Sequence, residues 1–220
     1  KTVEVFPQWR CRIDMIVVQD SPLPATIDEV FKATVVKVFD GDGFLADLWN
    51  PYREVWVPRI PFRFAFIDAP EVGQPFGPES REFLEGLILG KTLRLDPISK
   101  QSANGNPLDQ YKRMLCMGYL TEEMQIGSIK YYMNGSCGEG TVKTARPVTR
   151  NIELEMIVNG WAWVLRQYRF DCEAEYFAAQ EDARNKRRGL WSMDNPEPPW
   201  NFKLRQRKMK PSAVGQGTLF

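Results

Sequence analysis

The chain contains no histidine among its 220 residues, and this absence excludes several kinds of active site. Ribonucleases that use His as general acid and base, Ser-His-Asp hydrolases and zinc sites built from imidazole all need that side chain. Any catalysis must therefore run on carboxylates, guanidinium groups, hydroxyls or a bound metal.

Cysteine is also scarce. The four cysteines lie far apart, at Cys11, Cys116, Cys137 and Cys172, and no two of them form a C-x-x-C pair. This spacing gives no support for a zinc ribbon or for a thioredoxin-type redox motif. An even count permits disulfides without requiring them.

Long apolar runs and an excess of one charge are missing as well. No segment approaches the roughly 20 apolar residues that a membrane-spanning helix needs. The 29 Lys and Arg nearly balance the 28 Asp and Glu, which leaves a net charge of +1. Affinity for nucleic acid would therefore have to come from local patches. The length predicts one domain with additions.

The most informative residues present are three acids and two arginines. The segment "VFDGDG" supplies Asp42, "RFAFIDAPE" supplies Arg63, Asp68 and Glu71, and "DQYKRML" supplies Arg113. Carboxylate oxygens suit a hard divalent cation, and guanidinium groups suit the oxygens of a phosphodiester. Such a set can stabilise the charge that develops when water attacks phosphorus, so it is typical of metal-dependent nucleases.

Hydrophobic alternation predicts five strands. Two runs meet in a hairpin at residues 40–43, whose glycines we expect to supply the positive φ of a tight turn. In the third run, Pro58 and Pro61 predict an irregular first half, and only residues 62–67 a firm strand. The segments "KTLRLDPI" and "RMLCMGYL" are the fourth and fifth strands.

Helical spacing appears in three places. Pro78 and Glu79 begin a helix that should stop near Gly90. A second helix follows residue 151, with an apolar stripe expected at Leu154, Ile157, Val158 and Trp161 and an end at residues 159–160. A third is expected from residue 171, as N-cap, to residue 188. The pattern predicts an α+β, mostly β fold: a five-stranded OB-fold barrel with about three packed helices.

The motifs "VVKVFDGDG", "FRFAFIDAPE", "DQYKRMLCMGYL", "ELEMIVNGWAWV" and "AQEDARNKRRGLWS" follow one another in an order that resembles the staphylococcal nuclease (thermonuclease) family over residues 31–192. The resemblance implies one calcium ion held by Asp42, Asp68 and the main-chain carbonyl of Ala69. It also implies phosphate binding by Arg63 and Arg113, with Glu71 as general base. Whether Glu71 takes the proton or mainly positions water stays open.

Each of these residues also has a plainer interpretation. Asp40 and Asp42 could be solvated turn formers, and we take Asp40 as a turn former and not a metal ligand. Arg63 and Asp68 could form a structural ion pair. The resemblance places Tyr111 and Tyr168 beside the bound nucleotide, where a ring can stack on any base, while barrel-rim packing is the alternative. We expect Trp161, Trp163 and Trp191 to be core residues.

The chain departs from the family pattern in four places. Gly43 stands where the family usually has threonine, which could weaken the hold on the nucleotide. Residues 1–30 form an N-terminal extension, 121–150 a hairpin-like insertion, and 193–220 a Pro-rich, basic tail. The tail, which begins its positive charges at Lys203, could add phosphate contacts or remain solvated.

The functional expectation is a calcium-dependent, sugar-nonspecific endonuclease that cleaves DNA and RNA to 3′-phosphate products. The alternatives are a catalytically silent barrel that binds nucleic acid and a protein-interaction module. No obligate protein partner and no membrane span are expected. The even cysteine count and the supply of calcium outside the cytosol favour export, to the periplasm or the medium, with a cytoplasmic location as the alternative.

Overall fold

The computed structural model describes residues 31–50, 53–98, 108–126, 129–133, 136–140 and 144–209. The N-terminal extension of residues 1–30, which includes Cys11, lies outside these residues. Within the described part of the chain, no helix is long and apolar enough to cross a membrane.

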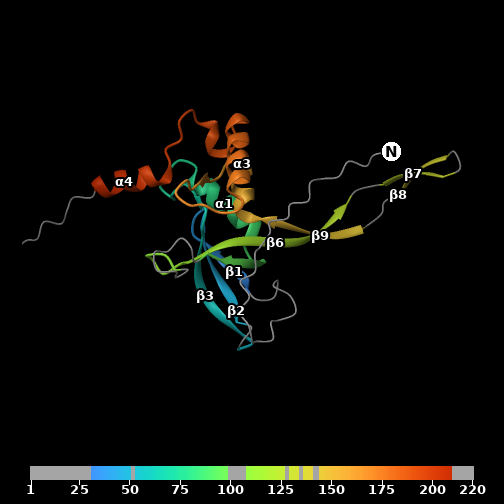
Figure 1. Cartoon of the computed structure of the whole chain (residues 1–220), viewed down its shortest axis with the longest axis horizontal. Helices are drawn as coiled ribbons and strands as arrows, with labels where there is room; N and C mark the ends of the chain where they lie inside the picture. Colours follow the sequence, from blue (N-terminus) through green and yellow to red (C-terminus); the bar gives the residue numbers. More distant parts are fainter. Residues whose placement is uncertain are drawn as a thin grey trace, which may run out of the picture.

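Five strands close into a barrel (Figure 1). They are β1 (Lys32–Val38), β2 (Gly43–Asn50), β3 (Val55–Phe64), β5 (Thr92–Pro97) and β6 (Met114–Ile126). Neighbouring strands pair antiparallel in the order β3-β2-β1-β5-β6, and β3 then pairs parallel with β6, from Phe62 opposite Met114 to Phe64 opposite Cys116. This last ladder joins the two edges of the sheet and confirms the predicted OB-fold barrel.

Strand β3 is longer than the sequence predicted. It runs over Val55–Phe64 through both prolines, and the irregularity is confined to a bulge opposite Asp47. There Arg59 adopts a φ of 58°, and its N–H donates to Asp47 Oδ1 at 2.9 Å. The irregular first half is therefore confirmed, but the predicted bounds of residues 62–67 were wrong: the strand begins at Val55 and ends at Phe64, because a one-residue bulge accommodates Pro58 without ending the ladder and Pro61 pairs in register with Leu45.

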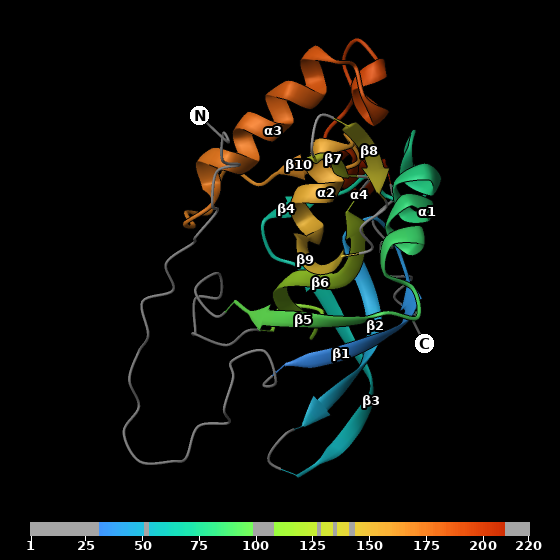
Figure 2. The ribbon, with the colours of Figure 1, turned by 90° about the vertical axis from the view of Figure 1, so that its right-hand side faces the viewer.

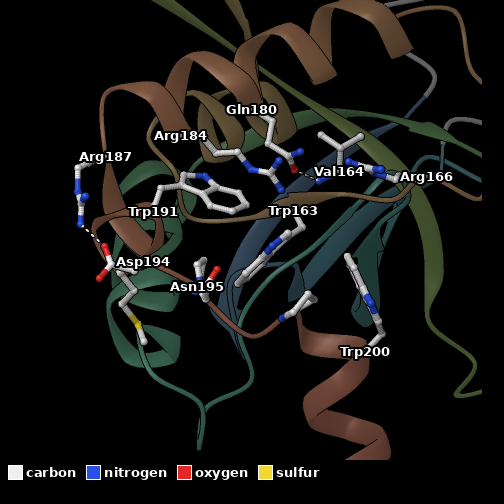
Figure 3. A pocket seen from close by; sticks show the side chains of 13 residues that line it. Trp163, Val164, Arg166, Gln180, Arg184, Arg187, Trp191, Asp194, Asn195 and Trp200 are labelled. Atoms are coloured by element: carbon white, nitrogen blue, oxygen red, sulfur yellow. Dashed lines mark hydrogen bonds and ion pairs between the residues drawn. The ribbon is translucent and has the colours of Figure 1, made fainter.

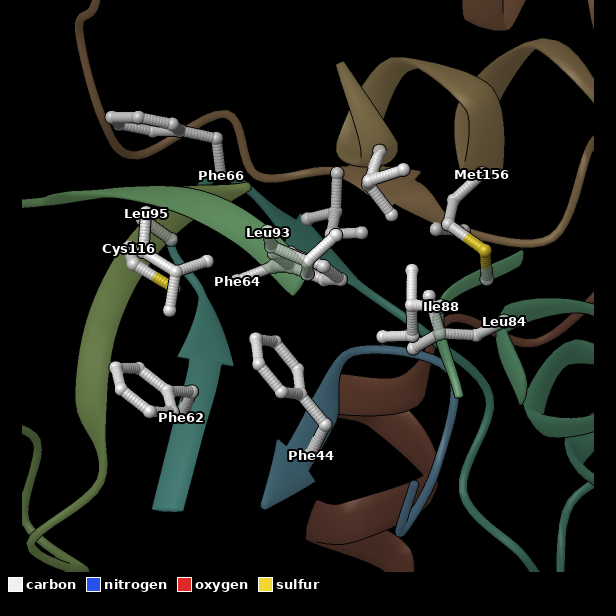
Figure 4. Packing of buried hydrophobic residues seen from close by; sticks show 14 of the residues in the cluster. Phe44, Phe62, Phe64, Phe66, Leu84, Ile88, Leu93, Leu95, Cys116 and Met156 are labelled. Carbon is white, nitrogen blue, oxygen red and sulfur yellow. The ribbon is translucent and has the colours of Figure 1, made fainter. Parts of the chain in front are cut away.

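Aromatic side chains fill the barrel (Figure 4). Phe44 of β2 and Phe62 of β3 stack at a centroid distance of 5.4 Å, and Phe64 lies 5.2 Å from Phe44. All three are fully buried. Such pairs contribute about 0.5–1.5 kcal/mol each beyond the area that they bury, so this cluster holds β2 and β3 in the register that places the site.

Four α-helices and a 3-10 turn complete the described fold. They are α1 (Gly77–Ile88), α2 (Ile152–Val158), α3 (Glu173–Asn185), the 3-10 turn η2 (Gly189–Ser192) and α4 (Pro199–Met209). Figure 2 shows α1, α2 and α3 gathered at one end of the barrel. Gly90 and Gly160 end α1 and α2 with φ values of 73° and 74°, as predicted. The fourth helix lies in the segment that the sequence suggested was a tail.

Two helix predictions need correction. In α2 the buried side chains include Ile152, Met156 and Ile157, whereas Val158 is 36% exposed. The helix is only two turns long, and Asn151 caps its start, where the side chain accepts the N–H of Leu154. Helix α3 (Glu173–Asn185) has Cys172 as its N-cap, one residue after the predicted cap, and ends at Asn185, three residues before the predicted end.

Three short pairings finish the description. Strand β4 (Ile67–Asp68) pairs with β10 (Trp163–Val164), which fixes the backbone of Asp68 against a segment far along the chain. In the insertion, β6 continues antiparallel to β9 (Thr144–Asn151), and β7 (Ile129–Met133) forms a hairpin with β8 (Ser136–Gly140). Figure 1 shows this ribbon extending away from the barrel, in agreement with the hairpin expected from the sequence.

Candidate active site

The turn between β1 and β2 carries the first two acids. Asp40 Oδ1 accepts the N–H of Asp42 at 3.1 Å, which confirms Asp40 as a turn former. The expectation that the glycines supply positive φ was wrong, since neither Gly41 nor Gly43 has one. Gly41 is needed for a different reason: a Cβ there would lie 2.0 Å from Ser80 Oγ and 2.6 Å from the Ala69 Cβ. The turn therefore packs directly against α1 and the loop after β4.

Asp42 and Asp68 converge on one nitrogen. Arg63 Nη2 donates to Asp42 Oδ2 at 2.9 Å and to Asp68 Oδ1 at 2.6 Å. Both carboxylate side chains are almost inaccessible, at 4% and 5% exposed. The N–H of Ala69 also donates to Asp42 Oδ2, at 3.2 Å. The structure thus brings together Asp42, Arg63, Asp68 and Ala69, which the sequence assigned to one site.

Burial and the charges of neighbouring groups shift the pKa values of the three aspartates. Burial and the neighbouring Asp42 charge raise the pKa of Asp68 to about 6. Burial acts to raise the pKa of Asp42, but the charges of Arg63 and Lys203, together with hydrogen bonds such as that from the Ala69 N–H, outweigh burial and lower that pKa. Partial burial and the neighbouring Asp42 charge raise the pKa of Asp40 to about 7. Carboxylates this close to one another are neutralised either by a proton or by a neighbouring cation. Such shifted pKa values are common in functional sites.

Arg113 faces the same cleft from the start of β6. Its Nε and Nη2 both lie 2.8 Å from Asp109 Oδ2, and its N–H donates to Asp109 Oδ1 at 2.9 Å. Its guanidinium carbon also sits 5.4 Å from the centre of the Tyr111 ring. Asp109 therefore orients Arg113, and sequence reasoning missed this residue although the four-residue spacing could have indicated an ion pair.

A cavity of about 410 Å³ joins these side chains. Its lining includes Arg63, Asp68, Tyr111, Arg113, Tyr168 and, from α4, Trp200. Tyr111 is 62% exposed, so its ring is available to a ligand, whereas Tyr168 is half-buried and packs against the core. Both tyrosines thus line the same cavity as the two predicted arginines, and Trp200 is an aromatic neighbour that the sequence did not suggest.

Glu71 lies just beyond β4 and is held by its backbone. Its N–H donates to Gln74 Oε1 at 3.2 Å, and its carbonyl accepts the N–H of Gln74 at 2.8 Å. Gly77 permits the tight path of this loop, because a Cβ there would lie 1.9 Å from the Glu71 carbonyl oxygen. The Glu71 carboxylate is partly exposed and accepts from Lys203 Nζ at 2.8 Å.

Lys203 is the main residue of the site that sequence reasoning missed. Its ammonium also contacts Asp68 Oδ1 at 3.0 Å, so it bridges two of the predicted site acids. The sequence suggested solvated or phosphate-contacting charge here. A helix could have been predicted instead, because Pro198 and Pro199 precede a run without glycine or proline, and proline is favoured in the first turn.

A larger cavity, of about 680 Å³, lies beside the site and contains none of the predicted residues (Figure 3). Its arginines are largely compensated: Arg187 pairs with Asp194 at 2.9 Å, and Arg184 pairs with Glu181 at 2.8 Å and stacks on Trp191 at 4.2 Å. Trp163 and Trp191 are buried, as expected for core residues. The predicted arginines and Asp68 line the smaller cavity instead.

The predicted calcium ligands have suitable chemistry but few side chains. Among the residues that the structure describes, no group of three or more His, Cys, Asp or Glu side chains is arranged as a metal site. The predicted set has only two such side chains, the carboxylates of Asp42 and Asp68, because its third ligand is a main-chain carbonyl. Asp42 and Asp68 nevertheless point to a common cationic nitrogen, and Asp68 and Glu71 to another, so the acids already hold positive charge at hydrogen-bond distance. This donor set fits a hard cation.

A small barrel that presents buried aspartates, two arginines and an exposed tyrosine ring at one cleft carries the groups that a nuclease uses to bind a phosphodiester. The family model described as staphylococcal nuclease homologue matches residues 61–193, and the chain belongs to this family. The resemblance stated from the motifs is confirmed.

Three relatives show the extent of the likeness. An uncharacterized endonuclease of Haemophilus influenzae is 33% identical over 173 residues, which cover 79% of this chain and 73% of that protein. The micrococcal nuclease of Shigella flexneri is 28% identical over 183 residues, 82% of this chain and 84% of that protein. A probable staphylococcal-like nuclease of Oryza sativa subsp. japonica is 29% identical over 156 residues, 71% of this chain but only 24% of the rice protein. The chain therefore spans most of the bacterial proteins and about a quarter of the plant one.

Proposed function

We propose that this member of the nuclease family is a calcium-dependent endonuclease that hydrolyses DNA and RNA to 3′-phosphate products. The observation that carries the proposal is the convergence of Asp42, Asp68 and Arg63, with Arg113 facing the same cavity. The names of the bacterial relatives support the reaction class.

In this proposal each side chain has one task. Asp42, Asp68 and the carbonyl of Ala69 would hold the calcium ion, which when bound supplies a Lewis acid that offsets negative charge on phosphate oxygen. Arg63 and Arg113 bind the phosphodiester and stabilise the transition state with planar, bidentate donors. To bind the phosphate, Arg63 must break its ion pairs with Asp42 and Asp68. Glu71 accepts or orients the proton of the attacking water.

The aromatic residues bind the nucleotide without reading its identity. The exposed ring of Tyr111 can stack on a base, and Tyr168 and Trp200 line the same cavity. Stacking is tolerant of sequence because every base has a π face, which supports cleavage of both DNA and RNA.

The test is cleavage of supercoiled plasmid, single-stranded DNA and RNA with calcium, magnesium or chelator. We expect cleavage with calcium, little with magnesium and none in chelator, because magnesium demands a more rigid octahedral ligand set. Products should resist polymerase extension until a phosphatase removes the 3′-phosphate. Asp42→Asn should abolish cleavage, while Asp194→Asn, at an exposed position, should not. The proposal is refuted if cleavage in chelator equals cleavage in calcium, or if neither the Asp42→Asn nor the Asp194→Asn protein cleaves.

We also propose that the enzyme is exported, on the ground of calcium supply alone. Cys116 is a buried thiol whose pKa is raised by burial, and it donates to the Arg63 carbonyl. With this thiol unbridged, the even number of cysteines no longer supports an oxidising compartment.

A further inference from the structure

Helix α4 brings a cation into the acidic site from far along the chain. Lys203 Nζ lies 3.0 Å from Asp68 Oδ1 and 2.8 Å from Glu71 Oε1. Asp68 is separated from Lys203 by 135 positions, so this contact exists only because α4 docks beside the cleft. The Lys203 side chain is 30% exposed, and its ammonium is directed to the carboxylates.

The docking of α4 does not depend on Lys203 alone. Phe202 is buried with 8% exposed, Trp200 lines the cleft, and Arg205 pairs with Glu197 at 2.7 Å. Gln74, which also holds the Glu71 backbone, donates through Nε2 to the carbonyl of Glu197. The helix is thus tied to the same loop that positions Glu71, and Lys203 is delivered by a packed element.

The charges around Asp68 cannot all remain in contact if a divalent ion is added. Asp68 Oδ1 already accepts from both Arg63 Nη2 and Lys203 Nζ. Three carboxylates, of Asp42, Asp68 and Glu71, face two monovalent cations. A calcium ion bound to Asp68 would lie beside the Lys203 ammonium and the Arg63 guanidinium, and like charges this close repel strongly.

We propose that Lys203 competes with calcium for Asp68, so that docking of α4 and binding of the metal oppose each other. The inference rests on the calcium dependence of the proposed function. Lys203 is on this account a positioning residue: it holds Asp68 and Glu71 in place without the metal, and it sets how tightly the metal binds. By linkage, calcium must weaken the attachment of α4 as much as that attachment weakens calcium.

The test is calorimetric titration of the full chain with calcium, without nucleic acid. Lys203→Met should tighten calcium binding by about 5- to 150-fold, the range over which coupled sites usually influence each other. Lys203→Arg, which keeps the charge, should bind close to wild type. Lys208→Met makes the same charge change on the same helix at an exposed position and should stay within about twofold of wild type.

Hydrogen exchange supplies a second measurement that a purely structural lysine would not alter. Saturating calcium should speed exchange of the α4 amides in the wild type, because the helix loses a tether. It should have no such effect in Lys203→Gln, which has already lost that tether.

The outcomes separate this inference from the proposed function. Equal calcium affinity in Lys203→Met and Lys208→Met, or unchanged α4 exchange in the calcium-saturated wild type, would overturn the role of Lys203 and leave calcium dependence intact. If neither the wild type nor Lys203→Met binds calcium, both the inference and the calcium assignment fall.

Discussion

Arg63 is the residue on which the two aspartates depend. One of its nitrogens contacts both carboxylates, and their charge raises its pKa, with Asp42 the larger cause. The guanidinium is therefore always charged. Its planar set of donors can exchange hydrogen bonds to the two carboxylates for hydrogen bonds to the oxygens of a phosphate. Arg113 is already oriented by Asp109 and needs no such transfer.

Replacing either arginine by lysine should reveal this geometry. Arg63→Lys and Arg113→Lys should each lower kcat by about 10²- to 10³-fold, because a point ammonium cannot reproduce bidentate donation. Arg169→Lys, at a 90% exposed position, serves as the control and should be neutral. Single-turnover cleavage measures the effect. Losses below about tenfold in both site variants would make these arginines structural.

Glu71 can be tested separately from the metal. Glu71→Gln should keep calcium and nucleotide binding while lowering kcat by about 10²- to 10⁴-fold, the usual contribution of a positioned acid or base. Calcium titration and single-turnover cleavage on the same protein decide the matter. A fall of calcium affinity in step with the rate would identify Glu71 as a metal ligand instead, and a near wild-type rate would remove it from the mechanism.

At the scale of elements, the site depends on close packing between the first hairpin turn and α1. Gly41 gives this contact its room, and Ser80 of α1 in turn donates to the Trp161 carbonyl at 2.8 Å. The turn that carries Asp42, the helix and the segment before β10 therefore form one packed unit.

Gly41→Ala should destabilise the fold by about 1–3 kcal/mol, because the added methyl group overpacks the turn against Ser80 and Ala69. Gly86→Ala is the matched control. Gly86 lies in α1 with nothing within 4 Å of its absent Cβ, so alanine there should stabilise by up to about 1 kcal/mol. Urea unfolding of both variants measures the difference. Equal behaviour would show that the turn can move away from α1 at no cost.

For the molecule as a whole, a buried acid links stability to pH. Glu153 of α2 is fully buried, where its Oε1 accepts the N–H of Phe66 at 3.0 Å and its Oε2 accepts the hydroxyl of Tyr176 at 2.8 Å. Burial raises its pKa from 4.5 to about 7. Between these values the folded protein binds a proton that the unfolded chain does not, so this group makes the free energy of unfolding fall as pH rises.

Glu153→Gln should remove that contribution. The wild type should lose on the order of 3 kcal/mol more stability than the variant between pH 4.5 and pH 7, with no further divergence at higher pH. Urea unfolding across the pH range gives the comparison, and the exposed Glu181→Gln should follow the wild type. Parallel curves for Glu153→Gln and wild type would mean that Glu153 stays ionised in the fold.

What the sequence by itself determined is the barrel and which residues of the candidate site come together. Alternating apolar residues specify strands locally, and glycine or proline ends them locally, so the order of elements follows from short stretches of chain. Asp42, Arg63, Asp68 and Arg113 stand at the ends of those strands, and closing the barrel brings strand ends together. Their convergence could therefore be anticipated from the motifs.

Only the tertiary structure decided the contacts between distant segments. The approach of Lys203 to Asp68, the collision that requires Gly41 and the burial of Glu153 under Phe66 and Tyr176 each join segments that share no local pattern. A glycine, a lysine or a glutamate has the same local signal whether it lies on the surface or inside. Its environment is set by which elements pack against it, and that packing is a property of the whole chain.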